Sequence, residues 1–190
     1  MIKCPILVGG GGSTEQLGIY PIGTDGRPTG DVIVPNGVTS LYQYIFYQDA
    51  AITSVSLPNS VTSLGTYCFG SCSSLTSITI PNSVTSLGTY CLYGCSSLTS
   101  ITINGSIIVF ASSSFQGCTA MTTFNTVSEF NPTSLNLSYT TVLTVDSMVS
   151  MFNNLATIGT TKTITLGTTN LAKLTNEQKA IATGKGWTLA

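Results

Sequence analysis

The amino-acid sequence predicts an α/β solenoid of about eight rungs, where a rung is one turn of the chain stacked on the turn before it. Parallel strands are expected on one face, and tight turns followed by α-helices on the other. The first observation is a repeat, because residues 58–80 and 81–103 are identical except at three of 23 positions. The second is that the same apolar pattern extends to both sides of these blocks, and the third is a helical pattern after residue 126.

Apolar side chains recur at every 23rd position through residues 35–126. One repeat cannot bury these side chains alone, whereas stacked repeats bury them in a continuous core. Near the end of each repeat apolar and hydroxyl residues alternate, which predicts a strand with Ile78 and Ile80 facing inward. The ladders are Val38, Val61, Val84 and Ile107; Leu41, Leu64, Leu87 and Phe110; Phe46, Phe69, Leu92 and Phe115; Ile52, Leu75, Leu98 and Met121; and Val55, Ile78, Ile101 and Phe124.

The segment after residue 126 continues the alternation of strands and turns in a looser form. Met148, Phe152 and Leu155 have the i, i+4, i+7 spacing of a helix face, and Thr175 with Gln178 forms a capping box. We expect these helices to replace the tight turns. The strands are expected at 143–145, 164–166 and 187–189. Three parts follow: an N-terminal anchor, 1–31; the repeats, 32–126; and helix-containing terminal rungs with a C-terminal cap, 127–190.

The repeat pattern resembles a known family. Over residues 32–126 it reads I-P-x-S-V-T-x-[IL]-G-x-x-x-F-x-x-C-x-x-L-x-x-I, which is similar to the BspA-like class of bacterial leucine-rich repeats. Cys68 and Cys91 stand where that family usually has Ala. Residues 171–189 resemble C-terminal segments of gut-bacterial surface proteins and of phage structural proteins. The resemblance implies display on an outer surface and contact with host proteins, glycans or other cells.

The composition excludes several classes of partner. Charged residues make up 7% of the chain and the net charge is −1, so no basic patch is available to bind nucleic acid. No apolar run approaches the roughly 20 residues of a membrane-spanning helix, so no membrane insertion is expected. The apolar run at 6–8 is shorter than the about 7–15 residues of a secretory signal, and no signal peptide is recognised.

The sequence predicts neither an enzyme nor a cofactor. There is no His, which removes the usual base of nucleophilic catalysis, and the seven carboxylates are scattered. Five of the six cysteines fall in two ladders, Cys68 with Cys91 and Cys72 with Cys95 and Cys118. Packing of small thiols in the core is the main interpretation. A zinc site and a disulfide between rungs are the alternatives.

Two groups of side chains are candidates for binding. The outward positions of the strands form a neutral stripe of hydroxyls, which could bind a glycan or a protein by hydrogen bonds, or could simply be solvated. A tyrosine ladder is also expected to point outward, and exposed aromatic rings favour interfaces and sugar stacking. Stacking of the rings on one another along the solenoid is the alternative. The candidates are Tyr44, Tyr67, Tyr90, Tyr93, Ser77, Thr79, Ser100 and Thr102.

These observations predict a non-enzymatic recognition or adhesion module that contacts a host protein or glycan. A phage virion (a tail, fibre or head appendage) is one carrier, in which the N-terminal segment would contact neighbouring virion proteins. A bacterial cell-surface adhesin of the BspA-like type and a purely structural virion protein are the alternatives. A homo-oligomer is compatible with each of them.

Overall fold

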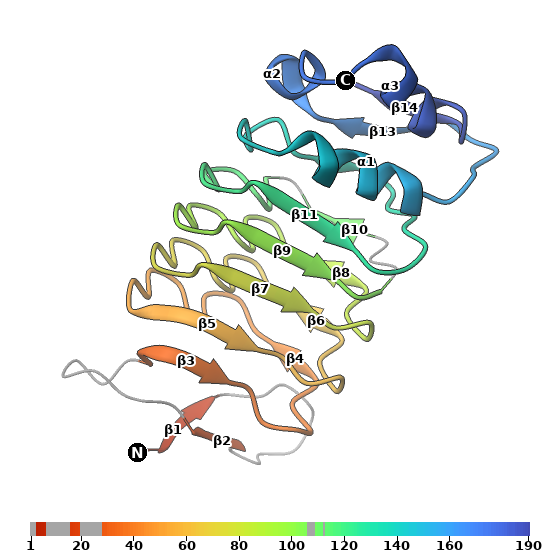
Figure 1. Ribbon diagram of the computed structural model, residues 1–190. Coiled ribbons are helices and arrows are strands. Elements are labelled where there is room, and N and C mark those ends of the chain that lie inside the picture. Colours follow the sequence, from red (N-terminus) through yellow and green to blue (C-terminus); the bar gives the residue numbers. More distant parts are fainter. Residues whose placement is uncertain (1–2, 7–15, 20–27, 106–108, 112) are drawn as a thin grey trace.

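A ladder of parallel strands forms the long face of the solenoid. The computed structural model describes residues 3–6, 16–19, 28–105, 109–111 and 113–190 of the chain (Figure 1). A seven-stranded sheet has the order β1-β2-β3-β5-β7-β9-β11, in which the strands from β3 onward are parallel and β1 and β2 pair antiparallel. These strands are β1 (Lys3–Ile6), β2 (Gln16–Ile19), β3 (Gly30–Ile33), β5 (Ile52–Ser56), β7 (Ser77–Ile80), β9 (Ser100–Ile103) and β11 (Thr123–Thr126).

The register of this sheet confirms the repeat. Ser54 pairs with Ser77, Ser77 with Ser100, and Ser100 with Thr123, so each strand lies 23 residues after its neighbour. The alternation also has the predicted direction, because Ile78 and Ile80 are buried and the intervening Thr79 is exposed. Period-2 alternation therefore separates the core from the surface along each strand.

A second side of each rung carries very short parallel strands, which the sequence pattern did not predict. The order is β10-β8-β6-β4, and a third, three-stranded sheet follows in the order β12-β13-β14. Strands thus lie on two sides of the core in the repeats rather than on one. They are β4 (Ser40–Leu41), β6 (Ser63–Leu64), β8 (Ser86–Leu87), β10 (Val109–Phe110), β12 (Leu135–Asn136), β13 (Lys162–Thr165) and β14 (Trp187–Leu189).

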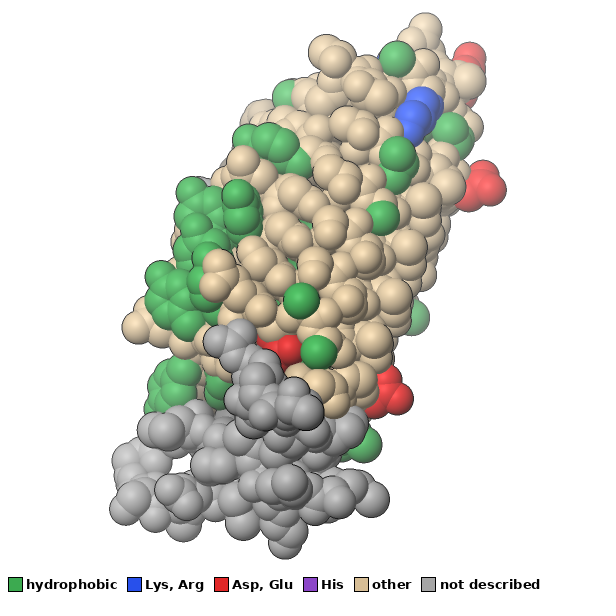
Figure 2. Space-filling model, turned by 90° about the vertical axis from the view of Figure 1, so that its left-hand side faces the viewer, with side chains coloured by type: hydrophobic (Ala, Val, Ile, Leu, Met, Phe, Trp, Pro, Cys, Tyr) green, Lys and Arg blue, Asp and Glu red, His purple; other side chains and the backbone are tan. Residues whose placement is uncertain are grey.

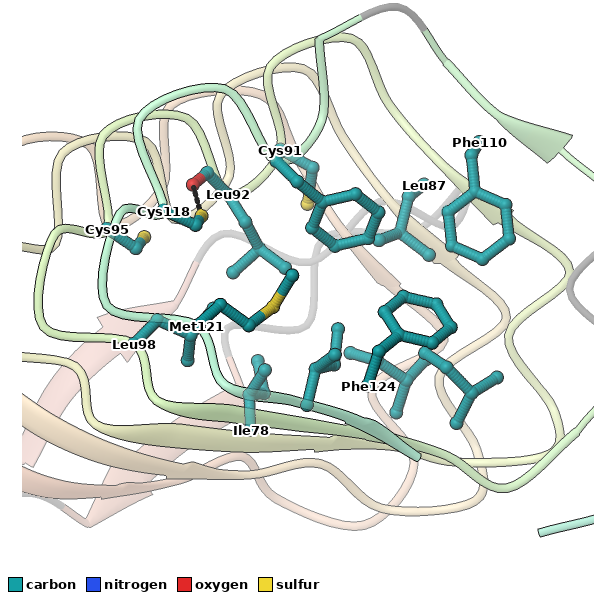
Figure 3. Packing of buried hydrophobic residues seen from close by; sticks show 14 of the residues in the cluster. Ile78, Leu87, Cys91, Leu92, Cys95, Leu98, Phe110, Cys118, Met121 and Phe124 are labelled. Atoms are coloured by element: carbon teal, nitrogen blue, oxygen red, sulfur yellow. Dashed lines mark hydrogen bonds between the residues drawn. The ribbon is translucent and has the colours of Figure 1, made fainter. Parts of the chain in front are cut away.

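The core lies between the two sides and consists of the predicted ladders. Every ladder position that the structure describes is buried, and Ile107 lies outside the described residues. Figure 3 shows side chains such as Leu98, Met121 and Phe124 pointing into one continuous interior from successive rungs. Phe46 and Phe69 stack with ring centroids 5.3 Å apart, so that equivalent side chains contact one another along the solenoid axis.

Three helices follow the repeats: α1 (Val145–Asn154), α2 (Gly167–Leu171) and α3 (Asn176–Thr183). The strand predicted at 143–145 is wrong. Thr144 is the N-cap of α1 and its side chain accepts a hydrogen bond from the backbone N–H of Ser147, while Asp146 lies in the first turn. The strands predicted near 164–166 and 187–189 are present as β13 and β14, and the capping box of Thr175 and Gln178 is confirmed.

The position of α1 also differs from the prediction. It packs against β11, on the long face and in the place of the next strand, not on the side of the tight turns (Figure 1). Ser147 accepts a hydrogen bond from the Phe124 backbone N–H at 2.7 Å and donates to the Phe124 carbonyl at 3.4 Å. Asn154 donates to the backbone carbonyl and hydroxyl of Thr126. Side chains of α1 therefore bond the backbone groups that a further strand would have paired. Within the described part of the chain, no helix is long and apolar enough to cross a lipid bilayer.

Candidate recognition surface

The tyrosine ladder is a stacked column on the surface of the repeats. We call Tyr44, Tyr67 and Tyr90, with the flanking Tyr47 and Tyr93, the tyrosine column. Tyr44 and Tyr67 stack at a centroid distance of 5.5 Å, and Tyr67 and Tyr90 at 4.8 Å. Tyr47 and Tyr93 meet these rings edge to face. Figure 2 shows hydrophobic side chains gathered in a column along one edge of the view, in the direction in which the repeats stack.

Stacking leaves the edges of the rings exposed and covers their faces. Both faces of Tyr67 are occupied, because Tyr44 lies on one side and Tyr90 on the other. Tyr44 is nevertheless 50% exposed, and Tyr67 and Tyr90 are partly exposed. The hydroxyls of these three tyrosines make no hydrogen bond within the described part of the chain. The column therefore combines both predicted arrangements and offers solvent the ring edges and phenol groups.

The backbone under the column is held in an uncommon conformation. Tyr44, Tyr67 and Tyr90 have φ values of 63°, 52° and 58°, in the left-handed region where a bulky L-residue is an outlier. The cost is about 1–2 kcal/mol for each residue relative to the right-handed conformation. Four positions further along each of the last two repeats, the chain places Gly94 and Gly117 at positive φ. In the first two repeats the same second position holds Gln48 and Ser71, also at positive φ, so glycine occupies it in only two of the four repeats.

The column is electrically neutral. Partial burial, followed by the neighbouring Tyr90 and the other tyrosines, raises the pKa of Tyr67 above its ordinary value. The phenol therefore remains protonated and keeps its hydrogen-bond donor near neutral pH.

The hydroxyl stripe lies on the long face, separate from the tyrosine column. Ser77 and Thr79 on β7 are exposed, and Ser100 and Thr102 on β9 are half-buried beside them in register. The tyrosines instead follow the short strands, across the core from β7 and β9. The structure therefore does not bring the two predicted groups together into one site.

A threonine ladder beside the stripe escaped the sequence analysis. Each hydroxyl donates to the backbone carbonyl of the preceding threonine at 3.0–3.2 Å, which fixes the side-chain rotamers. Thr recurs every 23 residues in the sequence, and this recurrence could have identified the ladder. The members are Thr53, Thr76, Thr99 and Thr122.

The cysteines pack in the core, as the main interpretation predicted. Cys68, Cys72, Cys91, Cys95 and Cys118 are buried with free thiols. The thiol of Cys72 donates to the Phe46 carbonyl, that of Cys95 to Phe69 and that of Cys118 to Leu92, each at 3.1 Å. Figure 3 shows the bond from Cys118 to Leu92. Burial raises the pKa of Cys72, Cys91 and Cys118 to about 12. Among the described residues, no three His, Cys, Asp or Glu side chains form a group able to hold a metal ion.

A cleft next to the fourth repeat was not foreseen. It has a volume of about 290 Å³ and lies where β10 and β12 face each other. Ser113, which lines the cleft, has φ 60° and occupies the fourth position of the tyrosine ladder, 23 residues after Tyr90. The cleft thus begins where the tyrosine column ends.

Known proteins share the repeat pattern and the fold of this chain. The family model described as BspA type leucine rich repeat region matches residues 39–161 in six copies. A solved leucine rich repeat protein of T. pallidum matches with 18% identity and a TM-score of 0.56, over 91% of this chain and 95% of that one. A leucine-rich repeat protein from Bacteroides ovatus matches with 20% identity and a TM-score of 0.53, over 71% of this chain and 38% of that one. The chain thus spans less than half of the second protein. At these identities the likeness establishes a shared fold. No curated protein matches the chain.

Proposed function

Because the chain belongs to the BspA-type leucine-rich-repeat family, we propose that it is a non-enzymatic recognition module on an outer surface, and that the tyrosine column binds a partner protein. The observation that carries this proposal is the conformation of Tyr44, Tyr67 and Tyr90. Bulky aromatic residues stand at this left-handed position in three successive rungs, although Ser113 shows that a small polar residue adopts the same backbone conformation in the fourth.

The arrangement of the rings favours a protein over a stacked sugar. A sugar stacks on the face of an aromatic ring, and the faces of Tyr67 are already covered by its neighbours. Ring edges with free phenol hydroxyls suit the mixed apolar and polar contacts of a protein interface, in which tyrosine is often a hot spot. The five tyrosines of the column carry no charge, so we expect binding to depend little on salt.

The hydroxyl stripe is proposed as a second, weaker contact surface. Ser77, Thr79, Ser100 and Thr102 could hydrogen-bond a glycan or a protein on the long face, away from the column. A partner large enough to contact both surfaces would have to reach around the rung.

For the carrier, we propose the surface of a bacterial cell. Supporting this choice, the BspA-type family model matches residues 39–161, and membership of that family implies display on an outer surface. A virion remains the second hypothesis, and it rests on the resemblance of residues 171–189 to phage structural proteins. Immunogold labelling of intact cells and of purified phage particles with an antibody to the chain would separate the two carriers.

The column is tested by replacing its three left-handed tyrosines together with serine. Serine is the residue that the fold itself places at this position in the fourth rung, so Tyr44→Ser, Tyr67→Ser and Tyr90→Ser should keep the backbone intact. The labelled chain is applied to an array of purified extracellular proteins, and we expect the triple variant to bind at least about tenfold more weakly.

The matched control is Tyr139→Ser, which removes a 43% exposed tyrosine outside the column. This variant should bind like the original chain. Either of two results would overturn the proposal: no extracellular protein is bound, or binding survives the triple substitution while circular dichroism shows an unchanged fold.

A further inference from the structure

The short-strand side of the solenoid is interrupted after the fourth repeat. Gly65, Gly88 and Ala111 each donate their backbone N–H to the preceding rung at 2.8–3.1 Å. Strand β10 then pairs only with β8, and β12 only with β13. Among the described residues, no backbone hydrogen bond joins 109–118 to 134–140. Two sheet edges therefore face each other without pairing.

Helix α1 gives a physical reason for this interruption. On the long face it takes the place of a strand next to β11. A helix is about 10 Å across, which is roughly twice the distance between paired strands. The rung that carries α1 is therefore thicker than the repeats before it. The cleft of about 290 Å³ occupies the space left between β10 and β12.

The cleft is lined by hydroxyl groups that have no hydrogen-bond partner among the described residues. Ser113, Ser134, Thr163 and Thr165 line it, and within the described part of the chain their hydroxyls make no hydrogen bond. Elsewhere on the surface, threonine hydroxyls of the repeats bond to the neighbouring rung. The hydroxyls of Ser77 and Thr79 on the long face are also unpaired among the described residues, so the cleft is distinguished by gathering several such hydroxyls around one cavity.

Asn136 adds an amide to this lining. Its Oδ1 accepts hydrogen bonds from the backbone N–H and the hydroxyl of Ser138, which holds the amide in place. Its Nδ2 remains as a donor with no partner among the described residues. None of the residues that line the cleft is charged. An ionic ligand would thus lose its hydration without gaining a counter-charge.

We propose that the cleft binds a neutral sugar unit of a glycan. A sugar presents several hydroxyls, each both a donor and an acceptor, to a lining of the same chemistry. The cleft volume of about 290 Å³ lies just below the about 300–1,000 Å³ range of small-molecule sites, which suits a single sugar ring. The fixed amide of Asn136 and the strand-borne hydroxyls of Thr163 and Thr165 present a rigid pattern of donors and acceptors.

An added peptide strand fits the same cleft less well. Strands β10 and β12 have two residues each, so a peptide between them would gain few ladder bonds.

The experiment is a titration of the full chain, labelled with ¹⁵N and methyl-¹³C, with methyl glycosides of glucose, galactose, mannose and N-acetylglucosamine. We expect one of them to shift the resonances of Asn136, Thr163 and Thr165 in a saturable way, with a dissociation constant on the order of millimolar. Thr163→Val with Thr165→Val removes two hydroxyls and keeps residues that favour strands. The double variant should bind at least about tenfold more weakly.

Thr188→Val is the matched control, because Thr188 pairs with Thr163 in the neighbouring strand and lies outside the cleft. It should leave the affinity unchanged. A second test, Ser134→Trp, should block the cleft by filling it. The proposal is overturned if no glycoside shifts these resonances, if the double valine variant binds as well as the original chain, or if the cleft responds only to an extended peptide.

Discussion

The hydroxyl of Ser147 bonds both the backbone N–H and the carbonyl of Phe124, a residue 23 positions earlier in the chain. In the repeats, the next strand would contact the sheet at this place. Ser147, together with Asn154, thus bonds the edge of the long sheet where the next strand would have paired. We expect Ser147→Ala to reduce the free energy of unfolding by about 1–3 kcal/mol, because the buried backbone N–H loses its partner. Urea denaturation measures this change. Ser150→Ala, at an exposed position of the same helix, should be nearly neutral.

Gly88 should not tolerate a side chain. A Cβ there would lie 2.6 Å from the backbone carbon of Gly65 and 2.6 Å from the nitrogen of Thr66, and neither atom can move away without shifting a rung. We expect Gly88→Ala to cost about 1–3 kcal/mol of stability or more. A Cβ at Gly159 would meet no atom within 4 Å, so Gly159→Ala is the control. Equal melting temperatures for the two variants would contradict the close stacking of rungs at Gly88.

At position 67 the glycine variant should be more stable than the alanine variant, which is the reverse of the usual order. Because its φ is 52°, Tyr67→Gly loses the same ring as Tyr67→Ala but is free of left-handed strain. The glycine variant should be more stable than the alanine variant by about 1 kcal/mol. At Tyr47, which is not among the residues with positive φ, alanine should be the more stable replacement. Chemical denaturation of the four variants measures their free energies of unfolding. A Tyr67→Ala variant more stable than Tyr67→Gly would show that the backbone of Tyr67 is not strained.

The cysteines should make stability fall at alkaline pH. Burial raises the pKa of Cys118 to about 12, whereas an unfolded thiol titrates near pH 8.5. The contribution of the buried thiol is therefore complete below about pH 8.5 and is lost as the pH rises toward 12. Between pH 8 and pH 10, Cys118→Ala should lose about 2 kcal/mol less stability than the original chain. Denaturation curves at both pH values test this, and parallel losses in the two proteins would argue against a buried neutral thiol.

The sequence predicted the parts of the fold that depend on periodicity. Residues such as Val61 and Val84 recur in register, and a recurring apolar position can only be buried by stacking. It failed at 143–145, where Leu143, Thr144 and Val145 alternate like a strand. The N-cap at Thr144 belonged to a helix whose position beside β11 depends on contacts distant in sequence.

The candidate site was predictable only in part, for a similar reason. The period places Tyr67 and Tyr90 in one column, but neither glycine nor asparagine signals their left-handed backbone. The cleft beside Ser113 depends on two strands that do not pair. No sequence pattern marks the absence of pairing between β10 and β12, so the cleft can be recognised only from the structure.

The hydrogen bonds from the buried thiols connect each rung only to the one before it. Cys95 bonds the carbonyl of Phe69 in the same way that Cys72 bonds that of Phe46. Because the contact is identical from unit to unit, duplication of a block such as 58–80 within the gene would leave no donor or acceptor stranded at the junction. Each duplication would also lengthen the column by one tyrosine. The length of the column can therefore change in steps of 23 residues without redesign of the interior.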